Sequence, residues 1–353
     1  MSADSVVIAS VGMTTPVGLS ATETAASVRS ATARFVETEI LDKGFQAFTL
    51  SEVPEKALPN VAELADGPLA PSARERRMLR LATRALAECL APLGKPATPV
   101  GLCLALPEME TARPLDRAAF LSRLATQSGG AFSPAGSDAS HVGRAGGLIA
   151  IGQAVLTIQS GLASIMIAGG VDSYHDLFVL TTLDRDERVK SKSNMDGFIP
   201  GEGACFLLLA SEQAAAAQRL PVLGRVTPMA SGFETGHLYS EEPYRGDGLA
   251  TTFQQLVARN VVDAPIGEVY SSMTGENHWA KEWGVAHLRT KAAFRPDARM
   301  HHPADCYGDT GAASGPLMVG LAAMGIKESY RRSPAIVYGS SDRGGRAAVV
   351  VTV

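Results

Sequence analysis

Short apolar runs alternate with helical patterns along the chain, which is typical of α/β layering. Runs that predict buried strands lie at 5–13, 100–106, 164–168, 204–209, 222–229, 268–272 and 335–338. Helical patterns begin near Ser20 and cover 72–92, 144–160, 248–258 and 309–324. The strand at 164–168 is expected to stop at Gly169-Gly170, and residues 107–140 are mixed and turn-rich. We therefore expect an α/β protein.

Two of these helices point to an internal duplication. The helix at 144–160 is apolar on nearly every face, and such a helix is normally buried in the middle of a domain. The helix at 309–324 is rich in small residues, and each helix is followed by a strand and a glycine-led closing strand, at 201–209 and 344–351. Repetition of this kind predicts two related halves, residues 1–215 and 216–353, with a seam near 211–221.

Composition excludes several classes of protein. The 353 residues are 46% hydrophobic and 19% charged, which is ordinary for a soluble globular protein. A net charge of -4 offers no basic footprint for nucleic acid or a membrane surface. Neither a signal-peptide pattern nor an apolar run of membrane-spanning length is present, and the cysteines lack metal or disulfide spacing. We expect a cytoplasmic protein without a metal or cofactor.

Two glycine-rich segments carry a family resemblance. Residues 168–173 (AGGVDS) and 194–204 (NMDGFIPGEGA) resemble a strand end and a loop of the beta-ketoacyl-ACP synthases, or ketosynthases, and Pro16-Val17-Gly18 also fits that family. The resemblance spans nearly the whole chain and is strongest over 140–210. It implies a thiolase-like fold of two duplicated halves stacked in five layers, αβαβα, with a reduced cap within about 30–140.

The same resemblance implies a site whose expected chemistry is missing. Ketosynthases need a cysteine thiolate at the start of the first buried helix, where the helix dipole and backbone N–H groups assist it. This sequence has Arg144 there, and a guanidinium stays protonated. The two family histidines fall near Ser272 and at Asp309, the lysine at Ala304, and the gating loop at 342–345 with Arg343. We expect no condensation of the usual kind.

Several roles remain open for these side chains. A salt bridge between Arg144 and Asp309 would plug the old site, because a buried cation needs a partner. Alternatively Arg144, Asp309, Arg343 and Cys306 form a site for an anion, including phosphopantetheine or coenzyme A. Cys306 is expected to approach the same cavity, where it is a candidate replacement nucleophile. Other candidate residues are three possible bases, His278, His301 and His302, and the loop 274–279 with Glu276, Trp279 and the nearby Trp283.

Three functions follow from these expectations. The first is a non-catalytic ketosynthase-like scaffold, chaperone or partner subunit, forming a homodimer or a heterodimer with a ketosynthase-like protein through a sheet edge. The chain is also similar to stand-alone degenerate ketosynthase-like proteins encoded beside type VI secretion effector genes, which implies a secretion-effector partner. The second is an acyltransferase or hydrolase rebuilt around Arg144, Ser272, Cys306 and Asp309. The third is a binding module for acyl carrier protein or coenzyme A esters.

Overall fold

The computed structural model describes residues 5–61, 70–94, 99–108, 115–258 and 264–353. Its strands are β1 (Val6–Thr14), β2 (Val36–Leu41), β3 (Ala47–Leu50), β4 (Gly101–Leu106), β5 (Asp138–His141), β6 (Ile165–Ser173), β7 (Glu202–Ser211), β8 (Gly224–Val226), β9 (Ala230–Phe233), β10 (Ile266–Ser271), β11 (Phe294–His301), β12 (Ala335–Ser340) and β13 (Gly345–Thr352). Its helices are α1 (Ala21–Arg29), α2 (Ala73–Leu90), α3 (Arg117–Gln127), α4 (Gly146–Gln159), α5 (Leu177–Arg185), α6 (Glu212–Ala217), α7 (Asp247–Ala258), α8 (Asn277–Thr290), α9 (Ala304–Tyr307) and α10 (Ser314–Lys327).

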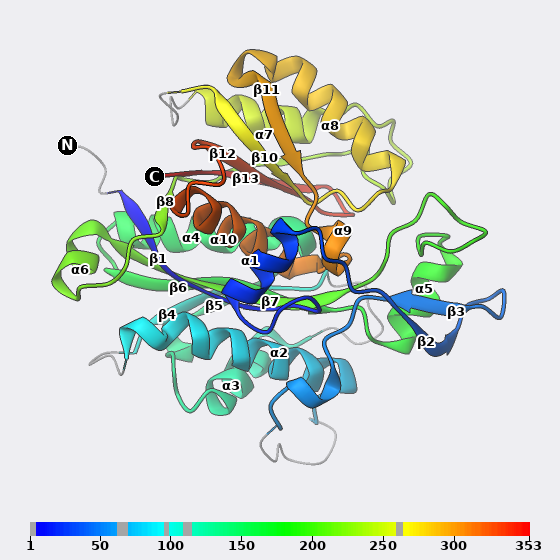
Figure 1. Ribbon diagram of the computed structural model, residues 1–353, viewed down its shortest axis with the longest axis horizontal. Coiled ribbons are helices and arrows are strands. Elements are labelled where there is room, and N and C mark those ends of the chain that lie inside the picture. The colour runs from blue at the N-terminus through cyan, green and yellow to red at the C-terminus, as the bar shows by residue number, and fades with distance from the viewer. Residues whose placement is uncertain (1–4, 62–69, 95–98, 109–114, 259–263) are drawn as a thin grey trace.

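These elements stack in five layers (Figure 1). Helices α7 and α8 cover the outer face of one layer of strands, α2 and α3 cover the outer face of the other, and α4 and α10 lie between the two. The main strands follow one hydrogen-bonded path, β11-β10-β12-β13-β8-β1-β7-β6-β4-β5, and β9 pairs with β13. The short strand β8 joins the two layers because it pairs with both β1 and β13. The αβαβα architecture expected from the sequence is confirmed.

The two layers repeat one order of elements. In the first, β1, α2, β4, α3, β5, α4, β6 and β7 follow along the chain, and in the second β9, α7, β10, α8, β11, α10, β12 and β13 do so. Their pairings also match: β5-β4-β6 and β11-β10-β12 are parallel, while β7 and β13 are antiparallel to both of their neighbours within these sets. Helix α6 lies between the two sets, so we keep a boundary at residue 215 as a proposal.

The two central helices pack closely because glycines face each other. A side chain at Gly147 would meet Pro316 Cδ at 2.1 Å, and one at Gly315 would meet the backbone nitrogen of Leu148 at 3.0 Å. Most residues of both helices are buried. A helix that is apolar on most of its sides is stabilised by burial, so the central position predicted for both follows from their composition.

Two expected element ends are wrong. Strand β6 continues through Gly169-Gly170 to Ser173, because these glycines serve close packing and do not end the strand. A Cβ at Gly170 would lie 2.2 Å from the carbonyl oxygen of Ala312. Helix α10 begins at Ser314, later than expected, because a 3-10 turn (Gly311–Ala313) precedes it and Gly311 has a positive φ of +48°.

Two further segments differ from the sequence expectation. The strand expected at 222–229 divides into β8 and β9, since Pro228 between them has no N–H for a ladder. Residues 107–140 contain α3 and β5, and α3 packs Phe120 and Leu124 against α2. In the expected cap, β2 pairs with β3, and residues 62–69, 95–98 and 109–114 lie outside the described residues. No helix in the described part is long and apolar enough to cross a membrane.

Candidate functional site

Arg144 lies in a 3-10 turn (Gly143–Ala145) that leads into the central helix α4. Its side chain is buried, and its Nε and Nη2 donate to Asp309 Oδ2 at 2.9 and 2.5 Å. Its Nη1 donates to Asp342 Oδ1 at 2.5 Å. Arg144 and Asp309 therefore face each other, as the family resemblance implied, and a second carboxylate joins them.

Asp309 is held by more than its ion pair. Its Oδ2 also accepts a hydrogen bond from the Tyr174 hydroxyl at 2.9 Å, and its Oδ1 accepts one from the N–H of Gly311 at the same distance. Burial raises the pKa of Tyr174 well above its usual value, so its hydroxyl stays protonated and donates. Both oxygens of the carboxylate are thus occupied by donors, which fixes its orientation.

A second buried cation, Arg188, completes an ion network. Its Nε and Nη2 donate to the two oxygens of Glu276 at 2.8 and 2.9 Å, and its Nη1 donates to Asp342 Oδ2 at 2.6 Å. Burial alone would raise the pKa of Asp342, but Arg144 and Arg188 hold it well below its usual range. Two guanidinium groups and three carboxylates, those of Asp309, Asp342 and Glu276, therefore carry a net negative charge.

Aromatic rings enclose this network. The guanidinium of Arg144 lies 5.6 Å from the ring centroid of Phe198 and 5.2 Å from that of Trp279, and Arg188 lies 5.2 Å from Phe198. Cations at such distances over ring faces are stabilised by the ring quadrupole. The Trp279 Nε1–H also donates to Glu276 at 2.8 Å. Trp279 therefore packs around the ion network.

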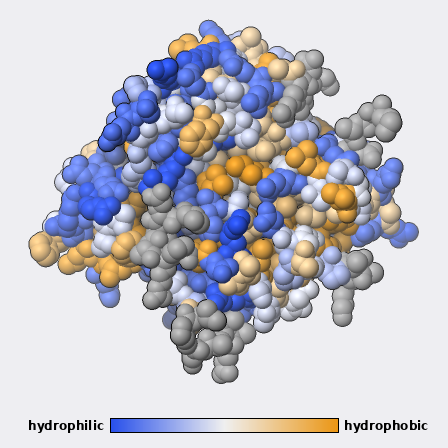
Figure 2. Space-filling model, turned by 180° about the vertical axis from the view of Figure 1, so that it is seen from behind, coloured by the Kyte–Doolittle hydropathy of each residue, from blue (hydrophilic) through white to orange (hydrophobic). Residues whose placement is uncertain are grey.

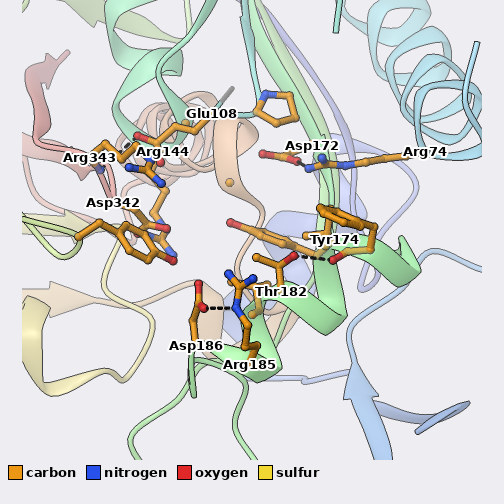
Figure 3. Close-up of a pocket in the computed structure, with 17 residues that line it drawn as sticks. Arg74, Glu108, Arg144, Asp172, Tyr174, Thr182, Arg185, Asp186, Asp342 and Arg343 are labelled. Atoms are coloured by element: carbon orange, nitrogen blue, oxygen red, sulfur yellow. Dashed lines mark hydrogen bonds and ion pairs between the residues drawn. The ribbon is translucent and has the colours of Figure 1, made fainter. Parts of the chain in front are cut away.

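A pocket of about 180 Å³ opens beside Arg144 (Figure 3). Figure 3 shows Glu108, Arg144, Asp342 and Arg343 on one side and Arg74, Asp172 and Tyr174 on the other. The lining residues are Arg74, Pro107, Glu108, Gly143, Arg144, Asp172, Tyr174, Phe178, Val179, Thr182, Leu183, Arg185, Asp186, Tyr239, Gly311, Asp342 and Arg343. Charges of both signs line the pocket, and several are already paired, as in the bond of 2.9 Å from Arg74 to Asp172.

Glu108 is a further titratable group in this pocket, and no motif of the sequence marks it. Burial, and then repulsion from Asp342, raise its pKa to about 7. A Cβ at Gly143, whose φ is +61°, would lie 2.8 Å from Glu108 Cγ, so glycine is needed there on both counts. One feature of the sequence could have indicated Glu108 as a site residue: it closely follows β4 and so lies at the carboxyl end of a buried strand.

The other predicted site residues divide into two groups. Arg343 lies at the Arg144 pocket, with its guanidinium 4.7 Å from the ring centroid of Tyr239. Ser272 and Ala304 are absent from the lining of this pocket. Ser272 follows β10 and its Oγ accepts from the N–H of Ser340 at 3.0 Å, while Ala304 begins α9.

The expected approach of Cys306 to the Arg144 cavity is wrong. Helix α9 turns Cys306 toward α1 and β10, where it lines a different pocket together with His301 and His302. His278 lies on α8 with its ring centroid 5.0 Å from that of Tyr244. None of the three candidate histidines is among the residues that line the Arg144 pocket. Among the described residues, no group of histidine, cysteine, aspartate and glutamate side chains could hold a metal ion.

Comparison with known proteins points to one family. Residues 141–215 match the model described as the N-terminal domain of beta-ketoacyl synthase. The actinorhodin polyketide putative beta-ketoacyl synthase 2 of Streptomyces coelicolor is 27% identical over 200 residues, which are 52% of this chain and 47% of that protein. The matched region therefore spans about half the length of this curated relative.

Solved structures agree over the whole chain. The ishigamide ketosynthase/chain length factor superposes with a TM-score of 0.81 at 16% identity, covering 99% of both chains. A type II polyketide ketosynthase in complex with its acyl-carrier protein gives 0.80, also at 16% identity and 99% coverage of both. An oxazolomycin ketosynthase domain from Streptomyces albus gives 0.77 at 16% identity, covering 99% of this chain and 74% of that one. At these identities the likeness concerns the fold.

Proposed function

We propose that this chain, a ketosynthase-like protein with the thiolase-like fold, acts as a partner or accessory subunit without condensing activity. The proposal rests on one observation: Arg144 occupies the position that the resemblance assigns to the nucleophile. Its guanidinium is buried and hydrogen-bonded to both Asp309 and Asp342.

The chemistry of this position supports a non-condensing role. Condensation requires a nucleophile at the start of α4, and a guanidinium held by two carboxylates stays protonated and does not attack an acyl group. The position assigned to one of the two histidines holds Asp309, both of whose oxygens accept hydrogen bonds. The network resists rearrangement, because breaking a buried ion pair leaves an uncompensated charge.

A free sheet edge beside this site supports pairing with another subunit. Among the described residues, β5 pairs only with β4 and ends the strand path. The Oγ of Ser140 on β5 is buried and lacks a hydrogen-bond partner in the described chain. On the adjacent helix α4, Leu156 is 58% exposed, and Leu162 just beyond that helix is 83% exposed. Open edges and exposed apolar side chains favour association with a second chain.

Hydrophobic side chains also gather on one surface of the molecule. Figure 2 shows them in the middle of the rear face, with mainly hydrophilic residues along its upper edge. We propose a dimer with a second copy or with another ketosynthase-like protein. A secretion-effector partner is a special case that rests on the family resemblance, and an acyl carrier protein is a further candidate partner.

The test combines activity with assembly. Purified protein is incubated with malonyl- and acyl-carrier substrates, and decarboxylation and acyl adducts are measured by mass spectrometry. We expect neither carbon dioxide release nor an adduct, together with a dimer in native mass spectrometry. An acyl adduct on Cys306 or on a serine would overturn the proposal, as would a chain that stays monomeric alone and with every ketosynthase-like protein encoded beside it.

The two alternative functions have less support. An acyltransferase rebuilt around Arg144, Ser272, Cys306 and Asp309 would need these side chains in one cavity. Cys306 lies instead in a separate pocket with His301 and His302, and Ser272 Oγ accepts from a backbone N–H. Burial raises the pKa of the Cys306 thiol, which works against a thiolate. A coenzyme A or acyl-carrier site at Arg144 would need free positive charge, and Asp309 and Asp342 already neutralise this cation.

A further inference from the structure

A second pocket, separate from the Arg144 site, lies where α1 approaches α9 (Figure 1). Its volume is about 220 Å³, and it shares no lining residue with the Arg144 pocket. Its walls come from the last turn of α1, the ends of β10 and β11, helix α9 and the turn after α10. These segments are far apart in the sequence, so the fold itself builds the pocket.

Two cations without a carboxylate partner line this pocket. The guanidinium groups of Arg29 and Arg331 lie 4.5 and 5.4 Å from the ring centroid of Tyr330. Both residues line the pocket, and within the described chain neither lies within salt-bridge distance of a carboxylate. Like charges on one ring repel each other, and an anion in the pocket would remove that repulsion.

Polar atoms at the pocket complete a set of hydrogen-bonding groups. The Nε of Arg331 and the Nδ1 of His302 are buried and have no partner among the described residues. Burial lowers the pKa of His302, so this imidazole is neutral at pH 7 and supplies a hydrogen-bonding nitrogen without a charge. Burial raises the pKa of Tyr270 to about 12, against the opposing effect of Arg331, so its hydroxyl remains a donor.

The remaining lining sets the charge and shape of a ligand. Among the described residues, Asp305 is the one carboxylate that lines the pocket and it is exposed, so Arg29 and Arg331 give this lining a net positive charge. Met300 and Leu321 supply apolar wall beside the tyrosine rings. An apolar wall with a few convergent polar groups is typical of a ligand site, and a volume of about 220 Å³ limits the ligand to a small molecule.

We infer that this pocket binds a small oxyanion, a carboxylate or phosphate group carried on an apolar body. Arg29 and Arg331 would contact the oxyanion, since guanidinium groups bind both kinds of anion through charge-assisted hydrogen bonds. The apolar body would pack against Tyr270 and Leu321. This inference does not depend on the partner role proposed above, because it involves none of the residues of the Arg144 network.

Calorimetric titration with three probes tests the inference: inorganic phosphate, phenyl phosphate and benzoate. We expect saturable binding of at least one probe, and comparison of the phosphate and carboxylate arms identifies the preferred head group. The double variant Arg29→Gln/Arg331→Gln should weaken binding about tenfold or more, because two charged donors are lost. The matched control Arg289→Gln, an exposed arginine on α8, should bind as the unmodified chain does.

Two further measurements establish which pocket the probe occupies and whether its charge is needed. Benzyl alcohol, which has the apolar body without the charge, should not bind, and Arg144→Gln should leave probe binding unchanged. The inference is overturned if no probe saturates, if the double variant binds as tightly as the unmodified protein, or if benzyl alcohol competes equally. Loss of binding in a folded Arg144→Gln variant would also overturn it, because the probe would then occupy the first pocket.

Discussion

Arg144 Nε and Nη2 both donate to the same oxygen of Asp309, Oδ2, at 2.9 and 2.5 Å. Arg144 lies just before α4 and Asp309 just before the 3-10 turn that leads into α10, so this contact connects the two duplicated layers at their central helices. The positions at which the resemblance implies a thiol and a histidine are thereby joined by an ion pair.

Removing the cation should destabilise the protein strongly. Arg144→Met leaves the buried Asp309 without its guanidinium partner, and leaves Asp342 paired with Arg188 alone. Loss of one partner of a buried ion pair costs about 3–5 kcal/mol of unfolding free energy. Urea denaturation of this variant and of Arg289→Met, whose ion pair with Asp247 is exposed, measures the difference. A loss below about 1 kcal/mol for Arg144→Met would show that the network contributes little.

Glu108 should make stability depend on pH. Its pKa is about 7 in the folded protein, above the usual glutamate value of 4.5, so the folded state holds this proton more tightly than the unfolded chain does. The stabilisation from the proton is full below pH 4.5, falls as the pH rises toward 7, and is absent above it. The expected span is about 3 kcal/mol.

The variant Glu108→Gln isolates this effect. It removes the titration, so the difference in unfolding free energy between variant and unmodified protein should grow in favour of the variant from about pH 4.5 to about pH 8. Chemical denaturation at several pH values across this interval measures it. A difference that stays constant with pH would contradict the raised pKa.

Part of this site was accessible from the sequence, and part was not. The two central helices could be placed from their apolar and small residues, and the ketosynthase resemblance implied that Arg144 faces Asp309. The ion pair of Arg188 with Glu276 joins residues 88 positions apart, and no local sequence pattern predicts it. The raised pKa of Glu108 depends on burial by distant segments and is equally invisible in sequence.

Two differences between the sequence expectation and the structure also arise from contacts or backbone turns that the sequence does not reveal. The sequence predicts a strand end at Gly169-Gly170, whereas in the structure Gly170 allows Ala312 to approach β6. Cys306 was expected near Asp309 because only three positions separate them. Cys306 lies within the short helix α9, and Gly308, whose φ is +69°, separates this helix from Asp309, so the thiol lines another pocket. The direction of the backbone over a single turn thus determines which pocket the Cys306 side chain lines.

A charged residue at the exposed apolar surface should disrupt association. Leu156→Glu places a carboxylate on α4, the helix that contacts the edge strand β5. It should shift the dimer toward monomer by tenfold or more in dissociation constant, about 1.4 kcal/mol. The matched control is Leu288→Glu on α8, since Leu288 is 75% exposed but lies in an outer layer, whereas α4 lies in the central one. Sedimentation equilibrium measures both. If both variants weaken the dimer equally, or if neither weakens it, the interface does not lie at Leu156.

The cysteines should react slowly in the folded protein. Burial raises the pKa of every thiol, to about 11 for Cys103, and no positive group offsets this for Cys306, which has Asp305 beside it. The thiolate is the reacting species, so alkylation by iodoacetamide at about pH 8 should be far slower than that of the same chain in denaturant. Mass spectrometry of timed samples measures the rate at each cysteine. Rapid, selective alkylation of Cys306 in the folded protein would reveal an activated thiol and would favour the rebuilt acyltransferase over the partner subunit.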